Sequence, residues 1–237
     1  MSNVTNTRRL LCDWQMPDIL NLLDIDTDFF VDQLVKVGAD TIEFTAKSAF
    51  GSALYPTRIG RRCSGMPEGR DIFGEVCNKA KAKDIKVIAY FNVLLDYDVS
   101  GERAGWLQRD AEGKTLVFEG YPMFCMSAAP YLTFISAHMR EVAELYEIDG
   151  IMLDIQYWHK EGCFCEHCSK KFLEDTGRDL SPSSFSIQDW LALGEFQRRT
   201  RRDFLLTMKD GADQARFGLE WSWNGSGNFS VNHELDE

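Results

Sequence analysis

The 237-residue sequence lacks the features that would mark a membrane protein or a nucleic-acid-binding protein. No apolar run is long enough to cross a bilayer, and the N-terminal MSNVTNTRRLL has no long apolar stretch followed by a small-residue cleavage site. Lys/Arg-rich runs are absent apart from short pieces such as Arg198–Arg202, and the formal net charge is −11. We therefore expect a cytoplasmic protein with no membrane partner and no nucleic-acid partner.

Several motifs that carry nucleotide or hydrolase chemistry are also missing. The sequence contains no G-x-x-x-x-G-K-[ST], no G-x-G-x-x-G after an expected strand, no G-x-S-x-G and no H-E-x-x-H. Nucleotide binding, serine-hydrolase chemistry and zinc-protease chemistry therefore lose support.

What the sequence does contain is material for one α/β domain. Hydrophobic residues make up 44% and charged residues 27%, and the length is close to that of one eight-stranded α/β barrel. Short apolar runs alternate with amphipathic segments. The expected strands are Arg9–Trp14, Thr41–Ala46, Lys86–Leu95, Gly150–Ile155 and Phe217–Trp223. The expected helices are Thr27–Gly38, Asp71–Lys83, Tyr131–Tyr146, Glu166–Asp175 and Ile187–Arg216.

This βαβα order predicts parallel strands covered by helices, in a TIM-type (β/α)8 barrel. Five strands are expected where a closed barrel has eight, and the Gly/Asn-rich NGSGNFSVN follows the fifth. We therefore expect a single (β/α)-barrel domain over residues 1–237 that holds the first five β/α units and is incomplete at its C-terminus. Such a sheet is either truncated or completed by a partner, and a homo-oligomer would cover its unpaired edges.

Seven cysteines in a chain without a secretory signal favour metal binding or free thiols over disulfides. Three of them form the pattern Cys163-x-Cys165-x-x-Cys168, and thiolates at this spacing can converge on one ion. Zinc prefers four sulfur or nitrogen ligands in a tetrahedron, so one further ligand is needed. The candidates for it are Cys125, His167, His159, Cys63, Cys77 and Cys12.

Asp154 is the residue at which a functional carboxylate is expected. It ends a buried apolar strand, where an ionised carboxylate is costly without partners. In an α/β barrel, residues at the carboxyl ends of the strands point into the active-site mouth. The position of Asp154 therefore favours a functional role over the capping of a loop.

The cysteines and the fourth strand together resemble a known family. The segment Cys125-Met-Ser-Ala-Ala-Pro130-Tyr131, the motif Asp149-Gly150-Ile-Met-Leu-Asp154 and the three-cysteine pattern are similar to the zinc-bearing β-galactosidases of glycoside hydrolase family 42. In that family one cysteine after the third strand joins three after the fourth. The resemblance implies a structural zinc ion (Zn2+) held by Cys125, Cys163, Cys165 and Cys168.

A second resemblance covers the region from Asp13 to Asp154. The segment Phe44-Thr-Ala-Lys47-Ser-Ala-Phe-Gly51, followed by Tyr55-Pro56-Thr57, is similar to the second-strand region of family 29 α-L-fucosidases. Asp149-Gly150-x-x-x-Asp154 matches their fourth-strand motif, whose aspartate is the nucleophile. The cysteine motif and the motifs of the second and fourth strands together resemble the group called hypothetical glycosyl hydrolase 6. The resemblance implies a glycosidase that cleaves an O-glycosyl bond of a carbohydrate with retention, fucosidase- or galactosidase-like, with Asp154 as nucleophile.

The sequence departs from both families. Ser48 and Ala49 replace the His-His pair of the fucosidases, and alignment on the cysteines places Asp154 and Ile155 at the Asn-Glu pair of family 42, whose acid/base is therefore absent. Retention requires a second carboxyl group about 5 Å from the nucleophile. The candidates for this second carboxyl group are Asp13, Asp96, Asp98 and Glu220.

Other side chains are expected to contact the substrate. They are Asp13, Lys47, Tyr55, Trp158 and Trp223, with aromatic faces for stacking on a sugar ring. The missing His-His pair and acid/base motivate an alternative function, a catalytically inactive barrel remnant that binds carbohydrate or another protein. A third alternative, a catalytic metal, fails if four sulfurs fill the coordination sphere.

Overall fold

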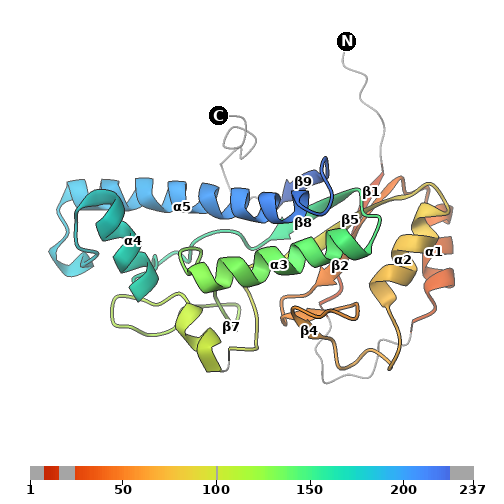
Figure 1. Cartoon of the computed structure of the whole chain (residues 1–237), viewed down its shortest axis with the longest axis horizontal. Helices are drawn as coiled ribbons and strands as arrows, with labels where there is room; N and C mark the ends of the chain where they lie inside the picture. The colour runs from red at the N-terminus through yellow and green to blue at the C-terminus, as the bar shows by residue number, and fades with distance from the viewer. Residues whose placement is uncertain (1–7, 16–24, 100, 225–237) are drawn as a thin grey trace, which may run out of the picture.

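The computed structural model describes residues 8–15, 25–99 and 101–224, and a mostly parallel β-sheet lies at its centre (Figure 1). Its parallel strands pair in chain order, each with the next. They are β1 (Arg9–Cys12), β2 (Thr41–Lys47), β5 (Lys86–Asn92), β8 (Gly150–Asp154) and β9 (Glu220–Trp223). The predicted α/β fold with a parallel sheet is confirmed for the described residues.

Helices connect the parallel strands, as the alternating sequence pattern predicts. Asp26 caps the first helix by accepting a hydrogen bond from the Phe29 N–H. Ser186 and Asp189 form a capping box at the start of the last helix. No helix in the described part of the chain is long and apolar enough to span a membrane. The helices are α1 (Thr27–Lys36), α2 (Ile72–Lys81), α3 (Ala129–Leu145), α4 (Glu166–Thr176) and α5 (Ile187–Asp213).

Short elements that the periodicity did not reveal decorate the sheet. The strand β3 pairs antiparallel with β2 and parallel with β4, and β6 and β7 form a hairpin in the long segment between β5 and α3. These elements are β3 (Ser52–Ala53), β4 (Arg61–Arg62), β6 (Val117–Phe118), β7 (Tyr121–Pro122) and the 3-10 helices η1 (Gly101–Trp106) and η2 (Pro182–Ser184).

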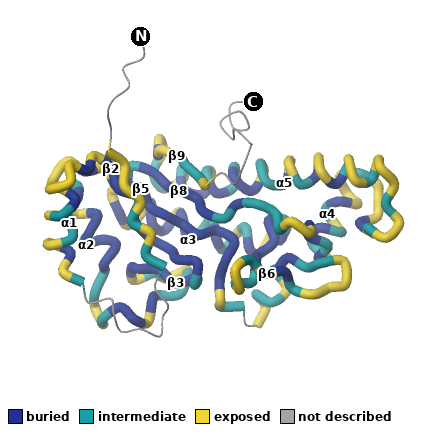
Figure 2. The backbone as a smooth tube through the Cα atoms, turned by 180° about the vertical axis from the view of Figure 1, so that it is seen from behind, coloured by how far each residue is buried: buried dark blue, intermediate teal, exposed yellow. Residues whose placement is uncertain are grey.

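The sheet has two different faces, because side chains alternate along each strand. One face carries the main core, in which Phe44 of β2 and Leu153 of β8 have no exposed surface. Figure 2 shows β5, β8 and α3 as largely buried. The opposite face holds a small separate cluster, made of Ile88, Tyr90 and Met152.

Arg9 on β1 reaches across to β9. Its guanidinium donates to Ser222 Oγ at 2.6 Å, pairs with Glu220, and donates to Glu43 on β2 at 2.7 Å. Because β1 and β9 lie at the two ends of the parallel run, one side chain can join them only if the sheet is strongly curved. Such curvature is the kind found in a barrel wall.

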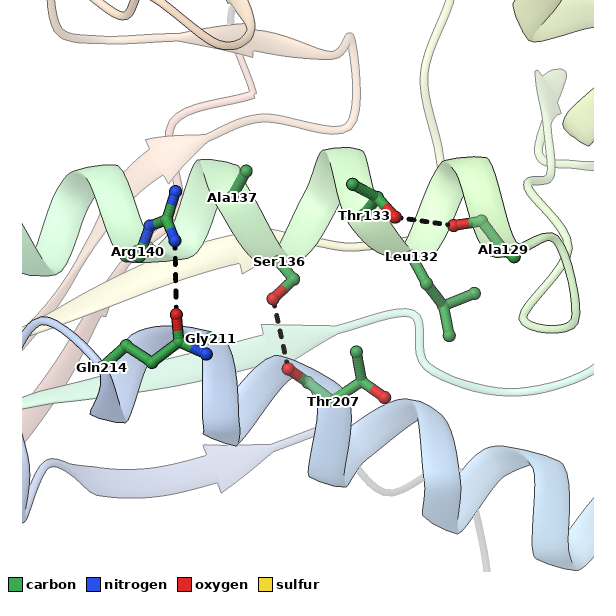
Figure 3. A pocket seen from close by; sticks show the side chains of 9 residues that line it. All are labelled: Ala129, Leu132, Thr133, Ser136, Ala137, Arg140, Thr207, Gly211 and Gln214. Atoms are coloured by element: carbon green, nitrogen blue, oxygen red, sulfur yellow. Dashed lines mark hydrogen bonds between the residues drawn. The ribbon is translucent and has the colours of Figure 1, made fainter.

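The helices α3 and α5 pack closely against each other on the outside of the sheet. Ser136 Oγ on α3 donates to the carbonyl oxygen of Thr207 on α5 at 3.2 Å (Figure 3). Gly211 permits this approach, because a Cβ atom there would lie 2.0 Å from Ser136 Oγ. Beyond this contact α5 continues toward α4 (Figure 1), and the rings of Phe172 and Phe196 meet at 5.4 Å.

The turn after β2 requires glycine at position 51. Gly51 has a φ of +84°, and its N–H donates to the carbonyl oxygen of Ser48 at 3.0 Å. A Cβ atom on Gly51 would lie 1.7 Å from Oδ1 of Asp96, a buried carboxylate 3.9 Å from the Lys47 ammonium. The turn therefore closes over a buried ion pair that leaves no room for a side chain.

Gly51→Ala should lower the free energy of unfolding more than Gly113→Ala. The two glycines have nearly the same φ, +84° and +83°, but no atom lies within 4 Å of a Cβ on Gly113. The Gly113 variant therefore reports backbone strain alone, about 1–2 kcal/mol. The Gly51 variant should lose about 1–3 kcal/mol more through its collision with Asp96. Urea denaturation measures both, and equal losses would contradict the packing around Asp96.

Candidate active site and metal site

The carboxylate of Asp154 lies at the C-terminal end of β8, where the residue is 8% exposed. Tyr90 Oη and Asn92 Nδ2 donate to its Oδ2, the latter at 3.3 Å, and Asn224 Nδ2 donates to its Oδ1 at 2.7 Å. Tyr90 and Asn92 belong to β5, and Asn224 directly follows β9. Neighbouring strands thus supply the partners that a buried carboxylate needs.

The segment after Asp154 is held in a strained conformation. Ile155 has a φ of +53°, which is a genuine outlier for a β-branched residue and costs about 1–3 kcal/mol. Next to it, the buried Gln156 accepts two hydrogen bonds from Arg201 of α5, at 2.7 and 3.1 Å. Gln156 Nε2 donates to the carbonyl oxygen of Asn224 at 2.5 Å. Arg201 therefore helps to fix the residue that donates to Asp154.

A second carboxylate, Asp13, joins this cluster from the end of β1. Gln15 Nε2 donates to Asp13 Oδ1 and to the Tyr90 hydroxyl oxygen, the latter at 3.0 Å, while Gln15 Oε1 accepts from the Ala49 N–H at 2.6 Å. Since Tyr90 donates to Asp154, one amide and one hydroxyl link the two carboxylates. Asp13 is exposed, yet partial desolvation raises its pKa, the Gln15 hydrogen bond opposes this, and the negative charge of Asp154 raises the pKa further.

The tyrosine between the two carboxylates remains a donor. Burial is the main cause that raises the pKa of Tyr90 far above its usual range, and the charge and hydrogen bond of Asp154 act in the same direction. The raised pKa keeps the hydroxyl protonated near neutral pH. It can donate to Asp154 but cannot act as a base.

Lys47 has a different set of partners. A shift of register between Thr45 and Lys47 interrupts β2, and Lys47 is 1% exposed. Its ammonium donates to the carbonyl oxygen of Asn92 at 3.0 Å and stands 3.9 Å from Asp96. Burial lowers the pKa of Lys47, and the charge of Asp96 opposes that effect. These contacts fasten the segment after β5 to β2, and none of them involves Asp154.

Tyr55 lies within the main core, and Trp223 packs against it. Tyr55 has no exposed surface, and its hydroxyl donates to Glu141 of α3 at 3.1 Å. Trp223 is in register with Leu153 and packs against the core. A ring without exposed surface offers no face to a sugar. The position of Tyr55 therefore differs from the expectation that it contacts the substrate. Trp158 is half-buried, and its indole N–H donates to the carbonyl oxygen of Gln197 at 2.9 Å.

The other candidates for the second carboxyl group have basic partners of their own. Asp98 pairs with Arg103 at 3.0 Å, Asp96 is buried beside Lys47, and Glu220 pairs with Arg9. Among the four carboxylates expected from the sequence, Asp13 is the one that the structure draws into the cluster around Asp154.

The neutral polar groups of this cluster were not expected from the sequence. Tyr90 and Asn92 interrupt an otherwise apolar run and stand two residues apart, so they share one face of the strand. That spacing was a usable signal. Gln15 and Asn224 follow strands β1 and β9, and no sequence pattern marks them as partners of Asp13 or Asp154.

Four buried cysteines form a group that can hold a metal ion. The Sγ atoms of Cys125, Cys163, Cys165 and Cys168 lie within 4.8 Å of one another. From Cys125 Sγ the distances are 3.4 Å to Cys168, 3.5 Å to Cys165 and 3.9 Å to Cys163. A tetrahedral ion with metal–sulfur bonds of about 2.3 Å places its sulfurs about 3.8 Å apart. The Ser127 N–H, 3.3 Å from Cys125 Sγ, supplies a further donor to the sulfur.

The remaining ligand candidates lie outside this group. His167 Nε2 contacts the carbonyl oxygen of Gly105 at 3.2 Å, and His159 Nδ1 accepts from the Glu161 N–H at 3.3 Å. Cys125 precedes α3, whereas the other cysteines of the group surround the start of α4. A metal ion would therefore tie the segment between β5 and α3 to the segment between β8 and α4.

The parallel sheet, its connecting helices and the polar cluster at the strand ends define an α/β domain with a candidate site at the carboxyl edge of its sheet. Residues 26–155, more than half of the chain, match the family described as hypothetical glycosyl hydrolase 6. The chain belongs to that family. A search of curated proteins found no match.

Solved structures of glycoside hydrolases share the fold. An α-L-fucosidase isoenzyme 2 from Paenibacillus thiaminolyticus is 24% identical, with a TM-score of 0.77 over 92% of this chain and 32% of that one. The PgaB glycoside hydrolase domain from Bordetella bronchiseptica is 12% identical, with a TM-score of 0.72 over 92% of this chain and 64% of that one. A β-galactosidase from Marinomonas ef1 is 12% identical, with a TM-score of 0.69 over 96% of this chain and 39% of that one. The chain thus spans about a third of the fucosidase.

Cys168→Ser should remove most of the metal that the purified chain carries. Loss of one of four sulfur ligands opens the coordination sphere, and a structural metal contributes its binding free energy to folding. Elemental mass spectrometry should find one ion per wild-type chain, and a chelator should lower the Tm of the wild type. Cys12→Ser, whose thiol lies outside the group, is the control that keeps the metal. Full metal content in Cys168→Ser would rule out this ligand set.

Proposed function

We propose that the chain is a glycoside hydrolase that retains the anomeric configuration, with Asp154 as its nucleophile. The observation that carries the proposal is the hydrogen-bond chain through Gln15 and Tyr90 that links Asp154 to a second carboxylate, Asp13, at the carboxyl ends of β8 and β1. Retaining glycosidases use two carboxyl groups about 5 Å apart, and barrel enzymes keep their active sites at this edge of the sheet. Membership of a glycosyl hydrolase family supports the same reaction class.

Asp13 is proposed as the acid and base. A general acid must be protonated when substrate binds, and partial desolvation and the charge of Asp154 raise the pKa of Asp13. Asp154 must be ionised in order to attack. Asp154 accepts three hydrogen bonds that orient it, whereas Asp13 accepts one from Gln15.

The reaction then proceeds in two displacements. An oxygen of Asp154 forms a bond to the anomeric carbon while the bond from that carbon to the leaving oxygen breaks, and the proton of Asp13 moves to the leaving oxygen. In the second step Asp13 takes a proton from water, the water oxygen bonds to the anomeric carbon, and Asp154 is released. Tyr90, Asn92 and Asn224 orient the Asp154 carboxylate in both steps.

The proposed substrate is a fucoside- or galactoside-like carbohydrate bound over Asp154. Trp158, half-buried in the segment after β8, is the aromatic side chain that we retain for contact with it. Lys47, Tyr55 and Trp223 are left out, because their partners lie in the core or around Asp96.

The metal is proposed to be a structural zinc ion. The all-sulfur donor set and the sulfur separations of 3.4 to 3.9 Å suit zinc. Four thiolates leave no coordination position for water or substrate, so the metal takes no part in the chemistry. Its role would be to hold the two segments that border the site.

Asp154→Asn should lower kcat/KM at least about 1,000-fold, because an amide cannot form the covalent intermediate. The measurement is nitrophenol release from a panel of aryl α- and β-glycosides. Asp203→Asn, a matched change at an exposed position of α5, should leave the rate unchanged. Unchanged turnover in Asp154→Asn would end the proposal. Silence of the wild type, with folding and metal retained, would favour a domain that binds carbohydrate without cleaving it.

Asp13→Asn should slow the hydrolysis of substrates with poor leaving groups more than that of substrates with good ones. Only a poor leaving group needs a proton from the acid. We expect a loss of about 100-fold or more with 4-nitrophenyl glycosides, and a smaller loss with 2,4-dinitrophenyl glycosides. The wild-type rate should fall as pH rises through the raised pKa of Asp13, since the acid is then ionised. That alkaline limb should disappear in the variant. Equal losses with both leaving groups would assign Asp13 another role.

A further inference from the structure

A cavity of about 410 Å³ lies between the β6–β7 hairpin and the segment after β8. One wall is the β6–β7 hairpin, with Phe118 and Glu119, and the other is the segment after β8, with Tyr157, Trp158 and His159. Its volume falls within the range of small-molecule binding sites. Neither the carboxylates of the proposed reaction nor the cysteine group belongs to its lining.

Gln108 holds the two walls together. This residue has no exposed surface, and its Oε1 accepts a hydrogen bond from the His159 N–H at 3.2 Å. Its backbone carbonyl accepts from the Leu116 N–H at 2.9 Å, immediately before the hairpin, and its Nε2 donates to the Phe124 carbonyl at 3.1 Å. The cavity is therefore built from a fixed framework, although its walls are about 40 residues apart in the chain.

The lining has the chemistry of a carbohydrate site. Phe118 and Tyr157 meet edge to face at 5.7 Å, and the indole of Trp158 is held by its bond to Gln197. Aromatic faces stack on the C–H face of a sugar, while Glu119 and His159 offer partners to hydroxyl groups. Aromatic and polar groups in one concave site of this size are typical of sites for polar organic ligands.

The cavity adjoins the proposed catalytic site. Tyr157 stands three residues after Asp154, and it shares the cavity with Glu119. Burial is the largest cause that raises the pKa of Tyr157, and the charges of both Asp154 and Glu119 raise it further. Because three residues of extended chain span at most about 11 Å, the Tyr157 wall of the cavity lies next to the proposed catalytic site.

We propose that this cavity is a subsite for a second sugar unit, the neighbour of the unit that Asp154 attacks in an oligosaccharide. The assignment of the neighbouring unit rests on the proposed function, whereas sugar binding in the cavity does not. The ligand class is a neutral oligosaccharide whose second ring stacks between Phe118 and Trp158.

The test uses the zinc-loaded full chain carrying Asp154→Asn, so that bound glycans are not cleaved. A glycan array of defined mono- and oligosaccharides identifies a bound oligosaccharide, whose Kd is then measured by calorimetry. Adding Phe118→Ala should weaken that Kd about tenfold or more, with a smaller effect on the matching monosaccharide. Phe217→Ala, at a residue 87% exposed on another surface, is the matched control and should change nothing.

A second variant keeps the test independent of packing. Glu119 is exposed, so Glu119→Gln should fold normally, and we expect it to weaken oligosaccharide binding several-fold. Near-ultraviolet circular dichroism and metal content verify the fold of each variant. Absence of any bound glycan, or binding that neither Phe118→Ala nor Glu119→Gln alters, would overturn the subsite. If the cavity variants weaken glycan binding but the wild type hydrolyses no glycoside, the subsite stands and the catalytic proposal fails. If the wild type hydrolyses glycosides and the cavity variants change neither binding nor hydrolysis, the catalytic proposal stands and the subsite fails.

Discussion

The burial of one carboxylate at the end of β8 is the constraint on which the rest of the site depends. Removing Asp154 from water is costly unless hydrogen-bond donors replace the lost hydration. The parallel sheet supplies them directly, because Asn92 is in register with Asp154 and the N–H of Asn224 bonds to the Leu153 carbonyl. Strand pairing and carboxylate solvation are therefore satisfied by the same arrangement, which makes the strand ends a rigid base for chemistry.

The two faces of the sheet divide the polar residues into separate groups. On the face that carries Ile88, Tyr90 and Met152, Arg9 spans from β1 to β9 and Tyr90 links Gln15 to Asp154. The buried pair of Lys47 and Asp96 instead stabilises the turn at Gly51 and the segment that leaves β5. A one-residue irregularity in β2 changes the partners of Lys47, since side chains alternate between faces.

The segments that border the site gain their order from long-range contacts instead of regular structure. The cysteine group brings together the segment before α3 and the start of α4, and Gln108 joins the β6–β7 hairpin to the segment after β8. Loops placed on a rigid scaffold commonly carry binding residues. Here a four-sulfur group and a buried amide can fix the loops that the sheet itself does not reach.

The sequence by itself determined the order and type of the main helices and strands, because apolar periodicity and buried runs are local properties. It also marked the position of Asp154 and the cysteine pattern. Tertiary structure decided which polar groups meet: Gln15 and Tyr90 are 75 residues apart, and only strand pairing brings them together. It also turned Tyr55 into the core, since a motif shared with a family records residue types, whereas burial depends on how strands and helices pack.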